Sequence, residues 1–343
     1  MAYIEQSWYA ALWAADLGST PIRRTYLGQN VALYRSSGGR PLALSDSCPH
    51  RFAPLSMGKV NGDAIQCLYH GLEFGPDGKC VHNPHGPIPP VARVRAYPIV
   101  ERAGMLWIWM GTGPADPAAL PDVALLEDAG WAWVRGTLAV KGNYQLVIDN
   151  LLDLTHVDYM HPFLRQKCDK PLRYQAKEQG ERVFAIYDRA EAPAGAFVHA
   201  IWRDGPPTVR VWARMRWDAP SNLFLDIGFT QVGDETDNGL RNPAYHFLTP
   251  ETPTSTHYFW AVGRNMRQDD LELSEGVRHG VQTTFVTEDE PMIAAIQEAM
   301  GNRELDEMKP LLLNIDNAAV RARRIVARRL ATESQKTNVT ELA

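Results

Sequence analysis

The sequence predicts an α+β protein of two domains, in which a β-rich N-terminal part precedes a part that combines strands with helices. The chain has 343 residues, more than a single domain usually contains. Residues 1–120 consist of short β-prone runs between turn residues, and residues 270–330 carry helical patterns. Hydrophobic residues make up 45% of the chain, enough for a buried core in each domain.

The N-terminal part is expected to be a small sandwich or barrel, because its strands are short and regularly interrupted by turns. The β-prone runs are residues 31–34, 42–44, 64–67 and 105–110, and the turn signals are residues 37–39, 61–63, 76–78 and 103–104. The Gly- and Pro-rich stretch 111–121 follows the last of these runs. We therefore expect domains at 1–115 and 122–335.

The second part begins with a predicted strand at 131–135 and a predicted helix at 144–156. Further strands are expected between 172 and 264, for example at 209–217, 223–229 and 256–262. One face of the predicted helix carries Leu146, Asp149, Asn150 and Asp153, which is unusually polar for a packed face. Near the end, residues 320–330 form a basic amphipathic pattern that we expect to pack through its Val, Ile and Leu side chains.

Two short cysteine–histidine pairs give the clearest chemical signal. Cys48 and His50 are separated by one residue, and Cys67 and His70 by two. A structural zinc site is one interpretation, but such sites usually pair Cys with Cys and His with His. Mixed pairs fit a Rieske [2Fe–2S] centre, in which two Cys bind one iron and two His bind the other. The spacing favours the Rieske centre over zinc.

Composition and charge exclude several other classes. A net charge of −5 argues against nucleic acid or an anionic membrane as partner. No stretch approaches 18 consecutive apolar residues, and the first residues lack the features of a secretory signal. Besides the two paired cysteines only Cys80 and Cys168 remain, too few for a disulfide framework. We expect a cytoplasmic protein.

A second metal site is expected around His156 and His161. An electron-transfer centre needs an acceptor, and the larger part of the chain should contain it. Two His and one carboxylate form the facial triad of non-haem Fe(II) oxygenases. Histidines five residues apart diverge on a regular helix, but Pro162 disfavours helical geometry at His161, so the two side chains can converge.

The carboxylate ligand is expected on the helical segment near residue 288. Glu288, Asp289 and Glu290 are consecutive there, and the spacing does not choose among them. Only one acid completes a facial triad. We expect at least two of the three to be surface charges.

The motifs together resemble the Rieske non-haem iron aromatic-ring oxygenases, in particular the vanillate O-demethylase and dicamba O-demethylase branch. The resemblance runs nearly end to end. It rests on Ser7–Tyr9, Cys48–Ser56, Tyr69–Glu73, Asp149–His156, Leu248–Thr252 and Glu288–Asp289. The last match selects Asp289 as the third iron ligand.

This resemblance implies an N-terminal all-β Rieske domain and a C-terminal helix-grip-like antiparallel sheet with helices. It also implies a homotrimer in which the cluster of one subunit passes electrons to the iron of the next. Asp153 matches the carboxylate that links a cluster histidine to an iron histidine across that interface. We expect it to accept a hydrogen bond from His156; a helix cap or surface charge is the alternative.

The implied reaction is O-demethylation of a methoxylated, vanillate-like aromatic acid to a phenol and formaldehyde. A separate flavin/iron–sulfur reductase would supply electrons from NAD(P)H, and O2 would be the co-substrate. His246 resembles a position that donates to a substrate carboxylate. By helical geometry around Asp153 and Asp289, we expect Asn150, Gln282 and Phe285 to line the pocket. Core packing is the alternative for each of these four residues. The alternatives are ring hydroxylation or aryl-ether cleavage of another aromatic acid, and a Rieske electron carrier with a vestigial second domain.

Overall fold

The computed structural model describes residues 2–164, 168, 172–234 and 238–341, and these residues form two compact units. One unit comprises Glu5–Val123 together with Thr249–Thr252. The other comprises the described residues of Met1–Ile4, Ala124–Leu248 and Pro253–Ala343. Each unit therefore receives a short segment from outside its main span.

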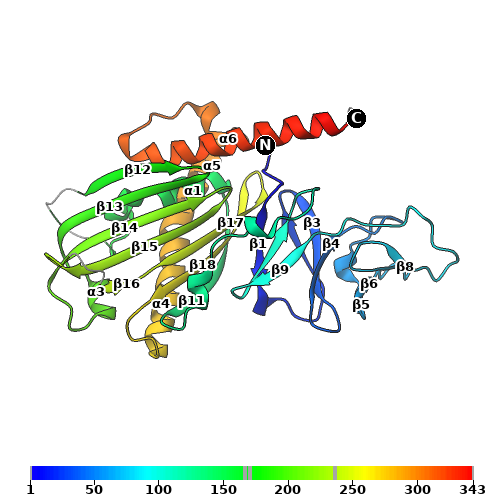
Figure 1. Cartoon of the computed structure of the whole chain (residues 1–343), viewed down its shortest axis with the longest axis horizontal. Coiled ribbons are helices and arrows are strands. Elements are labelled where there is room, and N and C mark those ends of the chain that lie inside the picture. Colours follow the sequence, from blue (N-terminus) through cyan, green and yellow to red (C-terminus); the bar gives the residue numbers. More distant parts are fainter. Residues whose placement is uncertain (1, 165–167, 169–171, 235–237, 342–343) are drawn as a thin grey trace. The chain divides into compact units, whose positions relative to one another are not determined.

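The unit formed by Glu5–Val123 is built from three small antiparallel sheets, as the turn-punctuated sequence predicts (Figure 1). Their strand orders are β1-β10-β9, β2-β3-β4 and β5-β6-β7-β8. The strands are β1 (Trp8–Trp13), β2 (Ile22–Tyr26), β3 (Gln29–Arg35), β4 (Pro41–Ser45), β5 (Lys59–Asn61), β6 (Ala64–Gln66), β7 (Glu73–Phe74), β8 (Cys80–His82), β9 (Ile99–Arg102) and β10 (Met105–Trp109).

Strands β1 and β10 are buried along their whole length, so both of their faces are covered. This explains why they read as continuous apolar runs instead of alternating ones. The segment Thr249–Thr252 completes the unit: the Pro250 and Glu251 carbonyls accept hydrogen bonds from the N–H groups of Leu27 and Gly28, at 2.8 and 2.9 Å.

The larger unit contains an eight-stranded sheet, shown in green to yellow in Figure 1. The strand order is β11-β18-β17-β15-β14-β13-β12, with β16 paired to β15. The strands are β11 (Ala132–Val140), β12 (Arg173–Gln179), β13 (Arg182–Pro193), β14 (Thr208–Asp218), β15 (Asn222–Gln231), β16 (Leu240–Arg241), β17 (Ala244–Thr252) and β18 (Ser255–Arg264). The predicted antiparallel sheet with helices is confirmed.

The helices of this unit are α1 (Tyr144–Leu152), α2 (Val157–Met160), α3 (Ala196–Ile201), α4 (Leu271–Thr284), α5 (Glu290–Met300) and α6 (Asn317–Glu341). Helix α6 packs against β12 and β13, and α1 packs against α5, α6 and β14. Ala322, Ile325 and Val326 of α6 are buried in the main core. The basic pattern at 320–330 is thus a packed amphipathic helix, as expected.

The predicted helix at 144–156 is too long, because α1 ends at Leu152. Asp153 has extended backbone angles, φ −104° and ψ 94°, and a separate 3₁₀ turn, Leu154–His156, follows it. The Asp153 side chain accepts the Thr155 N–H at 2.8 Å and so caps this turn. Helical periodicity alone does not reveal the break, since the apolar pattern continues through it.

The segment between α4 and α5 is a π-helix, Phe285–Asp289. Its defining bond runs from the Glu290 N–H to the Phe285 carbonyl, five residues back. Pro291 follows directly; it has no N–H, and its ring would collide with the Thr287 carbonyl in a regular α-helix. The widened turn is the local response to that proline.

No helix in the described part of the chain is long and apolar enough to cross a membrane.

Gly28 and Gly78 have nearly the same φ, so substitutions at the two positions distinguish backbone strain from steric overlap. Gly28 (φ +76°) has open space where the Cβ of another residue would lie, whereas a Cβ at Gly78 (φ +77°) would lie 2.0 Å from the Val94 carbonyl oxygen. Gly28→Ala should cost about 1–2 kcal/mol from the left-handed conformation alone. Gly78→Ala should cost about 1–3 kcal/mol more. Thermal unfolding followed by circular dichroism measures both, and equal losses would contradict the steric argument.

Candidate metal centres

The two cysteine–histidine pairs lie on two loops with the same hydrogen-bonding pattern. In the first, the Cys48 N–H donates to the Ala53 carbonyl (2.9 Å) and the Phe52 N–H to the Cys48 carbonyl (2.8 Å). In the second, the Cys67 N–H donates to the Leu72 carbonyl (2.8 Å) and the Gly71 N–H to the Cys67 carbonyl (3.0 Å). Each loop therefore closes five residues after its cysteine.

The residue four positions after each cysteine is left-handed: φ is +59° at Phe52 and +72° at Gly71. The first loop thus makes with a phenylalanine the turn for which the second uses a glycine. Left-handed geometry is costly for a bulky residue, and such strain concentrates at functional sites. The Phe52 residue is 78% exposed.

The donor atoms of the loops suit a cluster with one buried and one exposed side. Cys48 and Cys67 are each 1% exposed, within an apolar cluster that includes Leu55 and Phe74. The His50 and His70 rings lie near each other on the outside, with centroids 4.5 Å apart. Burial raises the pKa of the Cys48 thiol to about 11, so the thiolate form requires a bound cation.

Neighbouring groups hold each loop in place. The buried Asp46 carboxylate accepts the Ser56 N–H at 2.6 Å and the Ser56 hydroxyl at 2.8 Å, which supports the first loop. At the second loop, the His85 ring hydrogen-bonds the His70 carbonyl through Nε2 at 2.9 Å. The two supports come from different segments of the chain.

In the larger unit, His156, His161 and Asp289 bring three potential ligand atoms within 4.8 Å of one another. The Nε2 atoms of the two histidines lie 3.5 and 3.4 Å from the same Asp289 oxygen, Oδ1. Ligands about 2.1 Å from one ion stand roughly 3–3.5 Å apart, so these separations suit a shared ion. Two His and one carboxylate on one side leave positions open for other ligands.

The break after α1 brings the histidines together. His156 ends the 3₁₀ turn, and His161 follows α2 with φ −111° and ψ 84°, outside the helical region as predicted from Pro162. Their ring centroids are 5.1 Å apart. Tyr187 of β13 fixes the break, because its hydroxyl donates to the Leu152 carbonyl (2.7 Å) and accepts the Leu154 N–H (3.1 Å).

The Nδ1 atoms of both histidines are occupied, which leaves both Nε2 atoms for a metal. His156 Nδ1 donates to the backbone carbonyl of Asp153. The expectation that the Asp153 carboxylate makes this contact is wrong within the chain; that carboxylate accepts the Thr155 N–H and hydroxyl. His161 Nδ1 donates to Glu288 Oε2 at 2.6 Å.

The two consecutive acids of the π-helix both turn toward His161. Asp289 is buried, and its Oδ1 also accepts a hydrogen bond from Asn150 Nδ2 at 3.1 Å. The Glu288 side chain is only 28% exposed. The expectation of at least two surface charges among Glu288, Asp289 and Glu290 is therefore wrong, because the π-turn directs Glu288 inward.

The protonation of His161 reflects the same charges. Burial lowers the pKa of His161, but the carboxylates of Asp289 and Glu288 outweigh burial and raise it above its usual value. In the metal-free protein the carboxylates therefore favour a positive charge on this imidazole. A divalent cation bound between His161 and Asp289 carries more positive charge than a proton, so the same carboxylates stabilise it more strongly.

A buried histidine–tyrosine pair lies in the same unit. His246 Nδ1 and the Tyr258 hydroxyl are 2.6 Å apart, and the Tyr258 ring meets Phe285 edge-on at 4.8 Å. His246 is 8% exposed, and its buried Nε2 has no hydrogen-bond partner among the residues that the structure describes. Burial lowers the pKa of His246 to about 4, so the imidazole is neutral near pH 7.

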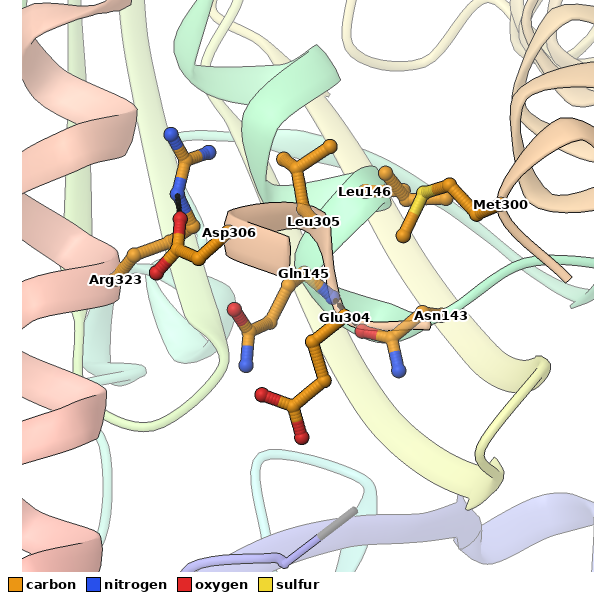
Figure 2. Close-up of a pocket in the computed structure, with 8 residues that line it drawn as sticks. All are labelled: Asn143, Gln145, Leu146, Met300, Glu304, Leu305, Asp306 and Arg323. Atoms are coloured by element: carbon orange, nitrogen blue, oxygen red, sulfur yellow. Dashed lines mark hydrogen bonds and ion pairs between the residues drawn. The ribbon is translucent and has the colours of Figure 1, made fainter. Parts of the chain in front are cut away.

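A small cavity elsewhere in this unit does not suit a substrate. Its lining residues are Asn143, Gln145, Leu146, Met300, Glu304, Leu305, Asp306 and Arg323 (Figure 2). Its volume of about 30 Å³ accommodates one or two waters. Arg323 pairs there with Asp306 at 3.6 Å and also with Asp149 of α1. The second ion pair explains why an acid lies on the packed face of α1.

Sequence reasoning missed three residues of these sites: Glu288 as a histidine partner, Tyr187 at the break and Tyr258 beside His246. The only usable signal was Pro291 two residues after Asp289, which marks a disturbed helix. The two tyrosines lie on strands whose pairing the sequence pattern does not define.

Comparison with known proteins identifies both parts. The family described as the Rieske [2Fe-2S] domain matches residues 7–98, and the vanillate O-demethylase oxygenase C-terminal domain matches residues 140–332. The chain is 40% identical to a chloroacetanilide N-alkylformylase oxygenase component of Rhizorhabdus wittichii, over 97% of each chain. It is 36% identical to the dicamba O-demethylase oxygenase component of Stenotrophomonas maltophilia, over 94% of this chain and 97% of that one.

A solved structure has the same fold. Dicamba monooxygenase bound to 3,6-dichlorosalicylic acid superposes with a TM-score of 0.90 at 35% identity, covering 97% of this chain and 99% of that one. Members of this family carry a Rieske cluster and a mononuclear non-haem iron and receive electrons from NAD(P)H through a reductase. The chain therefore belongs to the Rieske non-haem iron monooxygenases, as the oxygenase component of a two-component system.

Proposed function

We propose that Cys48, His50, Cys67 and His70 bind the Rieske cluster and that His156, His161 and Asp289 bind the mononuclear iron. The observation that carries the second assignment is the meeting of both Nε2 atoms at one Asp289 oxygen, 3.5 and 3.4 Å away. The Rieske assignment is supported by the two loops of like hydrogen-bonding pattern, whose thiols are buried and whose imidazoles lie on the outside. The division into domains 1–115 and 122–335 remains part of this proposal.

When bound, the cluster supplies single electrons and the iron activates O2. The chain's own contribution is to hold three ligands on one side of the ion and to position the substrate carbon on the other. Asn150 helps to hold the ligands, because its side chain donates a hydrogen bond to Asp289. The expectation that Asn150 also contacts substrate stays a prediction, as it does for Gln282 and Phe285.

The substrate we propose is a methoxylated aromatic acid, which loses its methyl group as formaldehyde. Relatives named dicamba O-demethylase and vanillate O-demethylase, 36% and 32% identical, support the reaction.

His246 is the residue that we propose binds the substrate carboxylate. Burial raises the pKa of the Tyr258 hydroxyl and so keeps it protonated, and we assign it as the donor to Nδ1 of the neutral imidazole. Nε2–H then remains as a buried donor, unpaired among the described residues, for a carboxylate oxygen.

N-dealkylation is the second candidate, and it rests on the 40% identity to the chloroacetanilide N-alkylformylase. Both reactions oxidise an alkyl carbon attached to a heteroatom, so the iron site would carry out the same chemistry in each. The substrate group that accepts a hydrogen bond from His246 differs, since an amide substrate offers a neutral carbonyl and an aromatic acid offers a carboxylate.

We further propose that the protein is a homotrimer served by a flavin/iron–sulfur reductase, and that Asp153 links the metal centres of adjacent subunits. The link to His156 runs through the backbone carbonyl of Asp153. Its carboxylate accepts two hydrogen bonds from Thr155, both through Oδ1. We propose that Oδ2, which accepts no hydrogen bond from the described residues, accepts one from the partner subunit's cluster histidine.

Iron content tests the metal assignment. The purified protein should contain about three irons per chain, two in the cluster and one mononuclear. Asp289→Ala should retain about two, keep the spectrum of the reduced Rieske centre and lose all turnover, because it removes a ligand at one site only. A colourless protein with one zinc, or an Asp289→Ala variant with full iron and activity, would overturn the assignment.

Substrate choice is tested with a panel of methoxybenzoates and N-alkyl anilides, supplied with a surrogate reductase and scored for aldehyde release and for ring-hydroxylated products. Formaldehyde from a methoxybenzoate supports the first proposal. Aldehyde from anilides alone supports the second. Ring-hydroxylated products without dealkylation would refute both.

The role of His246 is tested with His246→Leu on whichever substrate is found. KM should rise by about 10- to 100-fold for an aromatic acid, because a hydrogen bond to a charged group is lost. The ratio of mutant to wild-type KM should be constant from about pH 6 to 8, since a pKa of about 4 keeps His246 neutral throughout this range. The matching substrate without its carboxylate is the control, and an equal KM increase for it would contradict the contact.

The role of Asp153 is tested with Asp153→Asn, which keeps the size of the side chain and removes its charge. Both metal centres should load, and turnover should fall by at least about tenfold. Reduction of the cluster by the reductase should be unchanged, while its reoxidation should slow. In stopped-flow measurements, slow reduction with normal reoxidation would show that Asp153 is not the link.

A further inference from the structure

We propose that Glu288 is a positioning residue of the second metal centre, which holds the His161 ring and strengthens it as a ligand. The contact is short and specific: His161 Nδ1 lies 2.6 Å from Glu288 Oε2, while His161 Nε2 faces Asp289 at 3.4 Å. This inference rests on the proposed iron site and goes beyond it, because it concerns a group that does not touch the ion.

The π-helix makes this arrangement possible. Consecutive side chains on an α-helix diverge by about 100°, so two neighbours rarely reach opposite sides of one ring. The Glu290 N–H bonds the Phe285 carbonyl five residues back, and the wider turn brings Glu288 and Asp289 to the same imidazole. One acid takes Nδ1 and the other faces Nε2.

The two iron histidines are held differently. His156 Nδ1 donates to the neutral carbonyl of Asp153, and His161 Nδ1 to the carboxylate of Glu288. Both contacts fix the same tautomer, but only the second is charge-assisted and therefore stronger. A carboxylate partner also increases the basicity of a metal-bound imidazole. His161 should consequently be the stronger electron donor to the metal of the two histidines.

The charge of Glu288 is directed at His161. Across the described ranges Glu288 has no ion pair with a lysine or arginine, and its one charged-group contact is with His161. Its side chain is 28% exposed, against 5% for that of His161, so the carboxylate remains partly hydrated while the ring is enclosed.

The experiment measures binding of Co(II) to protein that retains its Rieske cluster but has been depleted of mononuclear metal. Glu288→Ala should weaken binding by about 10- to 100-fold, the usual effect of losing a ligand's outer partner. Glu288→Gln keeps an acceptor without the charge and should lose less. Glu298→Gln, an exposed acid on α5, is the matched control and should bind as wild type.

The visible spectrum of bound Co(II) separates positioning from ligation. At saturating metal the Glu288 variants should show the wild-type coordination bands, because all three ligands remain, and retention of the cluster absorbance confirms folding. If Glu288→Ala binds as tightly as wild type, the positioning role is wrong. If it abolishes binding as Asp289→Ala does, Glu288 is itself a ligand and the inference is also wrong. If wild type binds no Co(II), the proposed iron site fails instead.

Discussion

Pro291 has no N–H to donate to the Thr287 carbonyl, and the long helical segment from Leu271 to Met300 changes its geometry just before it. The resulting π-turn places Asp289 against both histidines and Glu288 against His161 alone. A regular helix over the same residues would direct one of the two acids to solvent. The arrangement of the two acids around the histidines therefore depends on a backbone restriction at Pro291, two residues beyond Asp289.

The histidine side of this centre depends on a similar interruption. Helix α1 ends at Leu152, and Tyr187 satisfies one carbonyl and one N–H that the interruption leaves open. Unsatisfied backbone groups at a buried helix end are costly, so a hydroxyl from the sheet stabilises the break directly. The segments that carry His156, His161 and Asp289 thus lie where regular helix is broken and the break is compensated.

Much of the architecture followed from the sequence. Turn residues and β-prone runs indicated the strands of the N-terminal unit, and Pro162 indicated the non-helical conformation of His161. The cysteine–histidine pairs that begin at Cys48 and Cys67 indicated a Rieske domain, and the family match over residues 7–98 confirms that domain. The end of α1 at Leu152 was not predicted, because capping by Asp153 competes with an apolar pattern that continues. The inward position of Glu288 was missed because an α-helical period cannot represent a π-turn.

The choice of Asp289 over its neighbours came from family resemblance, since spacing treats the three acids alike. The left-handed Phe52 could not be foreseen either, because nothing in composition marks a bulky residue for that conformation. These misses share one physical cause. Each concerns a break from regular backbone geometry, made by a cap, a proline or a tight loop, which a helical or strand period does not represent.

The segment Thr249–Thr252 matters for anyone who wishes to recombine parts of this protein with those of its relatives. A fragment cut at the Gly- and Pro-rich stretch 111–121 lacks these four residues, and with them the carbonyl acceptors for Leu27 and Gly28 and the Thr249 hydroxyl that donates to Ala10 at 2.6 Å. The cluster-bearing unit is therefore discontinuous in the gene. A chimaera that exchanges it must transplant two stretches of coding sequence, one of which lies within the catalytic half.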